Sequence, residues 1–242
     1  MQVVPALRGE GFYIEENFGF RYFPTPNNFG QEKAAVLIIH GFPGDTSKNE
    51  DIATSLALHG YGLYIVHLKG LGESKGKFKY SEASNNIRKI AEFICKIHGV
   101  QKLHIIGHSF GGFCALSIKD VAESLVLLAP LVSLSTVAPL ELLAKEFYSK
   151  HKDRLAYESE ENLLEDLKVT SELFSQQSLM KGLEKVKTLL IHGTKDERIS
   201  VDSSRKLKEK LSPLSSYLEL NEDHKFSENR RALVSAIKQF FA

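Results

Sequence analysis

The chain has 242 residues, enough for one sizeable domain, and its 31 Lys and Arg residues balance 30 Asp and Glu residues to a formal net charge of +1. A charge so close to neutral excludes the basic footprint of a protein that binds nucleic acid or an anionic membrane surface. No segment approaches roughly 18 consecutive apolar residues, and the N-terminus lacks a basic stretch followed by an apolar core, so the sequence predicts neither membrane insertion nor a secretion signal.

The chain begins with a predicted β-hairpin at residues 11–23, where apolar and polar residues alternate around Glu15, Glu16 and Asn17. The segment PTPNNFG, residues 24–30, is predicted to end this hairpin. From there, short apolar strands alternate with helical patterns. The predicted strands are 34–40, 61–68, 102–109, 124–130, 188–196 and 216–224, and helices are predicted at about 47–59, at about 81–98 and after each of the last two strands.

The predicted strands are nearly continuous runs of Val, Ile and Leu, which is typical of strands buried on both faces. Together with the intervening helices they predict an α/β fold, with a mostly parallel, doubly wound sheet and an N-terminal antiparallel hairpin. The two cysteines, Cys95 and Cys114, fall within apolar helical patterns, which indicates buried free thiols and a reducing, cytoplasmic location.

The alternation stops at residues 131–185, where helical patterns dominate. We expect residues 1–130 and 186–242 to form the core and 131–185 to form a helical lid over the strand ends. The alternative is that these helices simply pack on the sheet. The acidic residues of this segment are expected to form a solvated helix face; they are Glu158, Glu160, Glu161, Glu165 and Asp166.

The segment LHIIGHSFGG, from Leu103 to Gly112, carries an apolar strand into a glycine-rich turn that presents Ser109. A strained turn of this kind needs neighbours without side chains, and Gly107 and Gly111 supply them. In a parallel sheet, ligands bind beyond the carboxyl ends of the strands, which is where Ser109 stands. The pattern therefore predicts a nucleophile elbow, with Ser109 at the start of a helix.

A serine hydroxyl needs a base, and a group that orients the base. His224 follows the last strand, at the same edge of the sheet as Ser109, whereas His192 and His108 lie within strands and His108 is expected to point away from the serine. Asp196 ends the strand before it and opens the next loop, and it is predicted to accept the imidazole Nδ1 proton. The predicted catalytic residues are Ser109, Asp196 and His224.

The attack of a serine on a carbonyl also requires hydrogen-bond donors for the oxyanion. The backbone N–H of Phe110, directly after the serine, is one predicted donor. The loop His40-Gly41-Phe42-Pro43-Gly44 follows the first parallel strand, and the backbone N–H of Phe42 is the second.

These features together resemble the α/β-hydrolase fold family, in which Gly-x-Ser-x-Gly, a His-Gly turn and the order Ser, Asp, His occur together. The short HGF loop, the helical insertion and the segment GLGESKGKF are most similar to small bacterial carboxylesterases that include cinnamoyl (feruloyl) esterases, and monoacylglycerol lipases are similar in outline. Relatives often have Asp-x-Arg-Gly-His-Gly where this chain has the segment His67 to Gly72, and Gln or Met where it has Phe110.

The function expected from these residues is hydrolysis of a small-molecule carboxylic ester with a short, medium or aromatic acyl group, through an acyl-enzyme. No cofactor is expected, and no Cys/His spacing suited to a metal is present. The alternatives are a peptidase, a thioesterase, an acyl transferase or a carbon–carbon hydrolase with the same residues, a non-catalytic binding protein, and a doubly wound redox enzyme. The sequence has no interface signature that predicts an oligomeric state.

Overall fold

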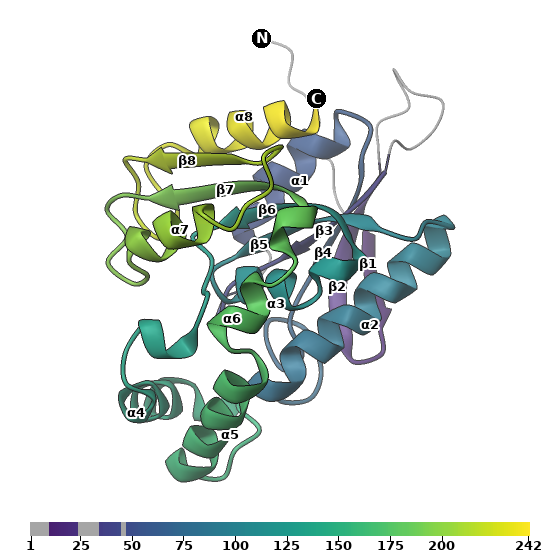
Figure 1. Ribbon diagram of the computed structural model, residues 1–242. Helices are drawn as coiled ribbons and strands as arrows, with labels where there is room; N and C mark the ends of the chain where they lie inside the picture. Colours follow the sequence, from purple (N-terminus) through teal and green to yellow (C-terminus); the bar gives the residue numbers. More distant parts are fainter. Residues whose placement is uncertain (1–9, 24–33, 45–46) are drawn as a thin grey trace.

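The computed structural model describes residues 10–23, 34–44 and 47–242, and its centre is an eight-stranded sheet (Figure 1). The strand order is β1-β2-β4-β3-β5-β6-β7-β8, and all neighbours from β4 to β8 in this order are parallel. The strands are β1 (Glu10–Ile14), β2 (Asn17–Tyr22), β3 (Ala35–Ile39), β4 (Gly62–Val66), β5 (Leu103–His108), β6 (Ala122–Leu128), β7 (Lys187–Gly193) and β8 (Ser216–Leu220).

The antiparallel pairs at one edge are β1 with β2 and β2 with β4, which confirms the predicted N-terminal hairpin. The predicted break at residues 24–30 lies outside the described residues. Because β1 and β2 add to the edge beside β4, the parallel strands that end near Ser109 remain in the interior of the sheet.

Helices cover both faces of the sheet, as the sequence predicts (Figure 1). They are α1 (Glu50–Ala57), α2 (Tyr80–His98), α3 (Phe110–Ser117), α4 (Leu140–His151), α5 (Glu160–Leu173), α6 (Gln176–Met180), α7 (Val201–Lys208) and α8 (Arg230–Phe241). Alternate residues of β3 enter two separate cores: Val36 and Ile38 pack with α1 and α8, whereas Leu37 and Ile39 pack with α2 and α3. This two-sided burial accounts for the unbroken apolar pattern of the strands.

Both cysteines are free and buried, Cys95 in α2 and Cys114 in α3, which confirms the predicted thiols. None of the helices in the described ranges combines the length and the hydropathy of a membrane-spanning segment.

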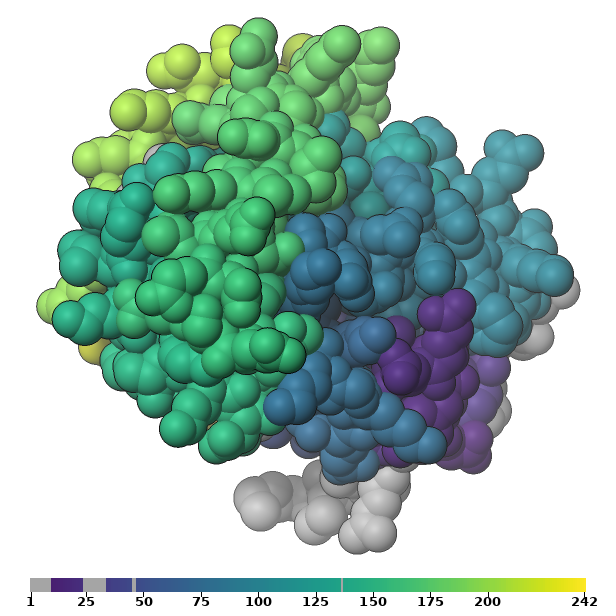
Figure 2. Space-filling view, turned by 90° about the horizontal axis from the view of Figure 1, so that it is seen from below, coloured from purple at the N-terminus to yellow at the C-terminus, as the bar shows by residue number. Residues whose placement is uncertain are grey.

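The segment between β6 and β7 contains α4, α5 and α6, together with short 3₁₀ turns. Figure 2 shows this segment, in green, beside the blue chain that leads into α2. The contact is a short parallel bridge: the Phe78 N–H donates to the Arg154 carbonyl (2.8 Å) and the Ala156 N–H donates to the Phe78 carbonyl (2.9 Å).

Asp166 of α5 is buried, which corrects the expectation that it belongs to a solvated acidic helix face. Its carboxylate accepts hydrogen bonds from the Tyr157 hydroxyl (2.6 Å), the Ser81 hydroxyl (2.5 Å) and the Ser81 N–H (3.1 Å). The Tyr80 N–H donates in turn to the Tyr157 oxygen (2.9 Å). Since a buried carboxylate needs such partners, this network fixes α5 to the first turn of α2.

Candidate active site

Ser109 follows β5 directly and has a left-handed backbone, with φ of 56° and ψ of −118°. A Cβ on Gly107 would collide with the Gly111 carbonyl oxygen, and a Cβ on Gly111 would collide with the Ile39 carbonyl oxygen. Both positions therefore require glycine for close backbone approach. The strained serine is held by its own backbone, since its N–H donates to the Leu128 carbonyl (2.9 Å) and its carbonyl accepts from Gly112 N–H (2.9 Å).

The structure brings Ser109, His224 and Asp196 into one hydrogen-bonded series. The Ser109 hydroxyl lies 2.9 Å from His224 Nε2, and His224 Nδ1 lies 2.7 Å from Asp196 Oδ2. Because an ionised carboxylate can only accept, Nδ1 carries the proton and Nε2 is free to accept from the serine hydroxyl. This arrangement prepares a hydroxyl to lose its proton to an imidazole.

The Asp196 side chain is fully buried and has donors on both oxygens. Oδ1 accepts from the N–H groups of Arg198 (2.8 Å) and Ile199 (2.9 Å), while Oδ2 accepts from His224 and from His192 Nε2 (3.1 Å). Burial by itself would raise the pKa of this carboxyl, but the hydrogen bonds from His192, His224 and Ile199 outweigh burial and hold the pKa well below its usual range. Asp196 is therefore a stable anion beside the imidazole.

The other nearby acids have different partners. The Asp223 carboxylate accepts from the N–H groups of Lys225 (3.0 Å) and Ser227 (2.9 Å). Asp202 pairs with Arg205 (2.8 Å) in the first turn of α7, where the Ser200 hydroxyl is the N-cap. Asp196 is thus the carboxylate that contacts His224.

His108 does not point away from the site, which corrects the expectation from strand alternation. Its Nε2–H donates to the His224 carbonyl (2.8 Å), and the two imidazole rings lie 5.0 Å apart. Burial, and then the nearby His224, lower the pKa of His108 to about 3, so its ring is neutral near neutral pH. His108 therefore supports the loop that carries His224.

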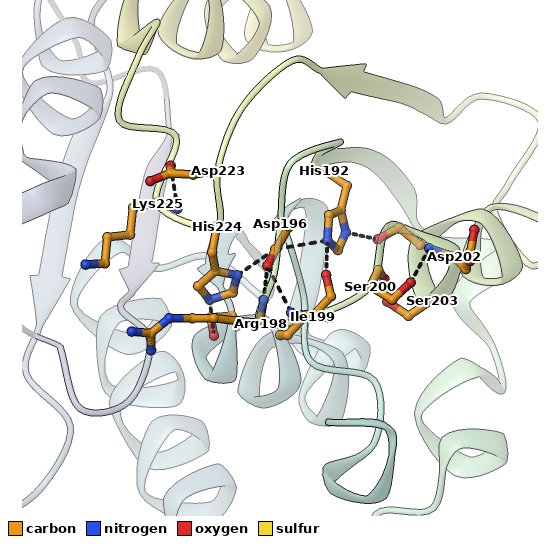
Figure 3. Close-up of polar contacts among 12 residues, drawn as sticks. His192, Asp196, Arg198, Ile199, Ser200, Asp202, Ser203, Asp223, His224 and Lys225 are labelled. Atoms are coloured by element: carbon orange, nitrogen blue, oxygen red, sulfur yellow. Dashed lines mark hydrogen bonds and ion pairs between the residues drawn. The ribbon is translucent and has the colours of Figure 1, made fainter. Parts of the chain in front are cut away.

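His192 of β7, like His108, lies at the site although its sequence position did not predict a role there. Figure 3 shows Asp196 between the imidazoles of His224 and His192. The sequence signal that could have identified His192 is its position four residues before Asp196, across the turn that ends β7.

The loop after β3 lies against Ser109. A Cβ on Gly41 would lie 3.0 Å from the Ser109 Cβ and 3.4 Å from its hydroxyl oxygen, so glycine admits the loop there. His40 holds the loop, because its Nδ1–H donates to the Gly41 carbonyl (2.7 Å) and its Nε2 accepts from the Leu68 N–H (3.0 Å). Phe42 follows directly, and Phe110 begins α3, where a backbone N–H has no partner within the helix.

Aromatic side chains surround this loop. The Phe42 ring lies 4.8 Å from Phe78, 5.4 Å from Phe147 of α4 and 5.5 Å from His151 of α4. Phe147 also stacks on Tyr80 at 5.9 Å. Helix α4 thus covers the loop beside Ser109 with apolar surface.

The segment from His67 to Gly72, where relatives often have a different turn, packs near the N-terminal hairpin. Gly72 lies against the His67 ring, and Lys69 forms an ion pair with Glu16 (2.6 Å). Lys69 thus ties this turn to the N-terminal hairpin.

Comparison with known proteins agrees with this fold. The Paleococcus ferrophilus monoacylglycerol lipase superposes with a TM-score of 0.70 at 22% identity, covering 93% of this chain and 98% of that one. The ferulic acid complex of Est1E from Butyrivibrio proteoclasticus superposes with a TM-score of 0.72 at 18% identity, covering 96% of this chain and 97% of that one. These likenesses show that the fold is that of the α/β hydrolases.

Sequence comparison identifies the monoglyceride lipase of Saccharomyces cerevisiae, which is 30% identical over 122 residues, or 47% of this chain and 38% of the yeast protein. An uncharacterized Mycobacterium tuberculosis protein is 30% identical over 145 residues, or 56% of this chain and 50% of that protein. The match thus spans half or less of the length of these relatives. The family model described as Hydrolase_4, serine aminopeptidase, S33, matches residues 30–183, more than half of the chain. The chain therefore belongs to the Hydrolase_4 family of α/β hydrolases.

Proposed function

We propose that the protein is a serine hydrolase that cleaves carboxylic esters through an acyl-enzyme. His224 Nε2 takes the hydroxyl proton as Ser109 Oγ attacks the ester carbonyl, and Asp196 stabilises the imidazolium that forms. His224 then gives the proton to the departing alcohol. Water repeats these steps on the acylated serine and releases the acid. The observation that carries the proposal is the pair of short contacts, 2.9 Å and 2.7 Å, that link the serine, the imidazole and the carboxylate.

The proposed oxyanion donors are the backbone N–H groups of Phe42 and Phe110. The support is their position: Gly41 lets the first loop contact Ser109, and Phe110 begins a helix whose amides favour negative charge. Each donor of this kind contributes about 3 kcal/mol to transition-state stabilisation in other serine hydrolases.

We further propose that residues 131–185 act as a lid and help to bind the acyl group, while 1–130 and 186–242 form the catalytic core. The partly exposed rings of Phe42 and Phe147 support short, medium or aromatic acyl groups, because such groups pack well against aromatic faces. The Asp166 network and the bridge at Phe78 tie one side of the segment to the core. Any opening movement is therefore expected in α4, of which only Leu143 and Ala144 are buried.

A second candidate is a peptidase, favoured by the family's description as a serine aminopeptidase. The same three side chains can attack an amide, and a fold hosts many reactions. Thioesters and carbon–carbon bonds next to a ketone are further substrates that the same chemistry admits.

The test is turnover of a substrate panel by the wild type and by Ser109→Ala. The panel contains p-nitrophenyl esters of increasing acyl length, cinnamate esters, monoacylglycerols, acyl thioesters and aminoacyl amides. We expect the esters to be the best substrates and Ser109→Ala to lower kcat by roughly 10⁴-fold or more. Ser55→Ala, on α1 at the other face of the sheet, is the matched control and should keep wild-type rates.

Two outcomes would contradict the proposal. Aminoacyl amides turned over faster than every ester would favour the peptidase. A folded Ser109→Ala variant with full esterase activity would remove the serine from the mechanism.

A further inference from the structure

The carboxylate that contacts His224 is shared with a second imidazole. His192 lies in β7, its side chain is fully buried, and its Nε2 is 3.1 Å from Asp196 Oδ2 and 2.9 Å from the Ile199 carbonyl oxygen (Figure 3). Its Nδ1 is 2.6 Å from the Ser204 hydroxyl in α7. Both ring nitrogens of a buried histidine are therefore partnered, one of them by the acid of the proposed catalytic group.

These partners determine where the proton lies on His192. A carbonyl oxygen and an ionised carboxylate can only accept, so Nε2 must carry a hydrogen, which it shares between Ile199 and Asp196. In the neutral ring Nδ1 is then an acceptor, and the Ser204 hydroxyl donates to it. Ser204 thus favours the form of His192 that donates toward Asp196.

The same oxygen, Asp196 Oδ2, receives the Nδ1–H of His224 and the Nε2–H of His192. The other oxygen is fixed by the N–H groups of Arg198 and Ile199. The four donors define the plane and the direction of the carboxylate. A rotation of that plane would weaken the contact with His224, because hydrogen bonds prefer angles above about 150° and weaken steeply below about 120°.

We propose that His192 is a positioning residue for Asp196 and that Ser204 keeps the His192 ring in its donating form. The proposal rests on the proposed function, since it concerns the acid of that site. His192 holds Asp196 in the orientation that stabilises the His224 imidazolium, and it touches neither the substrate nor the reacting atoms. Its effect should fall on kcat and leave KM unchanged.

The first test compares His192→Gln with His192→Leu. The side-chain nitrogen of Gln is as many bonds from Cβ as Nε2 of His, so Gln retains a donor toward Asp196, whereas Leu has none. With p-nitrophenyl acetate, we expect Leu to lower kcat about 10-fold, with KM within about twofold of wild type, and Gln to stay within about threefold. Rates are normalised to active sites counted by end-point titration with a fluorophosphonate, which removes unfolded protein from the comparison.

The second test repeats His192→Leu in an Asp196→Asn background. A positioning residue acts through the carboxylate, so once the carboxylate is gone the leucine should cause little further loss in kcat. A role in folding alone would lower thermal stability in both backgrounds and leave the rate per titrated site unchanged. If His192→Leu does not accumulate as folded protein, His192→Asn replaces it, because the Asn amide reaches only the position of Nδ1, facing Ser204.

Three results would overturn the inference: a His192→Leu rate per site equal to wild type, an equal loss for Gln and Leu, or a full 10-fold loss that persists in the Asp196→Asn background. Each of these differs from failure of the proposed function. That failure would appear as activity in Ser109→Ala, whereas an inactive Ser109→Ala with an unaffected His192 series would refute this inference alone.

Discussion

His108 gives a pH dependence of stability that can be calculated from its surroundings. Burial and the adjacent His224 lower the pKa of His108 to about 3, against about 6.5 for an ordinary histidine. Between these two values the unfolded chain binds a proton that the folded chain does not, so the free energy of unfolding falls as the pH is lowered. The slope is about 1.4 kcal/mol per pH unit below about pH 6.5 and vanishes above it, so the loss between pH 7.5 and pH 5.0 is about 2 kcal/mol.

The variant that isolates this effect is His108→Gln. Its side-chain amide can still donate to the His224 carbonyl, but it does not titrate. Urea denaturation followed by far-UV circular dichroism at the two pH values should show that the wild type loses about 2 kcal/mol more than the variant. His59→Gln, a replacement of an exposed histidine on the turn after α1, is the control and should follow the wild type. Equal losses in the wild type and His108→Gln would rule out His108 as a source of this pH dependence.

Three further predictions concern the elbow, the helical segment and a thiol. Gly111→Ala should destabilise the fold by more than about 3 kcal/mol in urea denaturation, because its Cβ would meet rigid backbone; Gly99→Ala, with open space and φ of 63°, should cost about 1 kcal/mol, and equal costs would contradict the account. Asp166→Ala should lower the free energy of unfolding by about 2–3 kcal/mol, because the buried Tyr157 and Ser81 donors lose their acceptor. The exposed Val169→Ala should change it by less than about 1 kcal/mol, and a similarly small loss for Asp166→Ala would be inconsistent with the network. Burial raises the pKa of the Cys114 thiol to about 12. Iodoacetamide should therefore leave Cys114 unmodified in the folded protein near pH 8, as measured by peptide mass spectrometry. Alkylation as fast as in denaturant would show that the thiol is accessible and reactive.

The fold could be predicted because its signals are local. Continuous apolar runs define the strands, and the hairpin alternates around Glu15 to Asn17. The predicted strands extend too far along the chain, since β7 ends at Gly193 and β8 at Leu220. Asp196 therefore lies in a loop and does not end a strand, whereas His224 lies in a loop as expected. The two loops form hydrogen bonds to each other: the Lys195 N–H, for example, donates to the Glu222 carbonyl (2.9 Å). Such bonds between distant segments are not visible in the sequence.

The proximity of Ser109, Asp196 and His224 could be inferred because carboxyl ends of parallel strands meet at one edge. The roles of His108 and His192 could not. Strand alternation directs His108 to the opposite side from its neighbour, but Ser109 leaves the strand with a positive φ, and the His224 loop folds onto His108 from 116 residues away. The acidic neighbours of Asp166 on α5 predict an exposed side chain, because its contact with Ser81 of α2 is created only by the tertiary fold.

The role of Ser109 as the nucleophile that His224 activates is best tested by covalent labelling. The protein is treated with a fluorophosphonate, digested, and the modified residue is identified by peptide mass spectrometry. We expect one adduct, on Ser109, formed at least about 10³-fold more slowly in His224→Ala. Modification of a different residue, or labelling of Ser109 at an unchanged rate in His224→Ala, would contradict it.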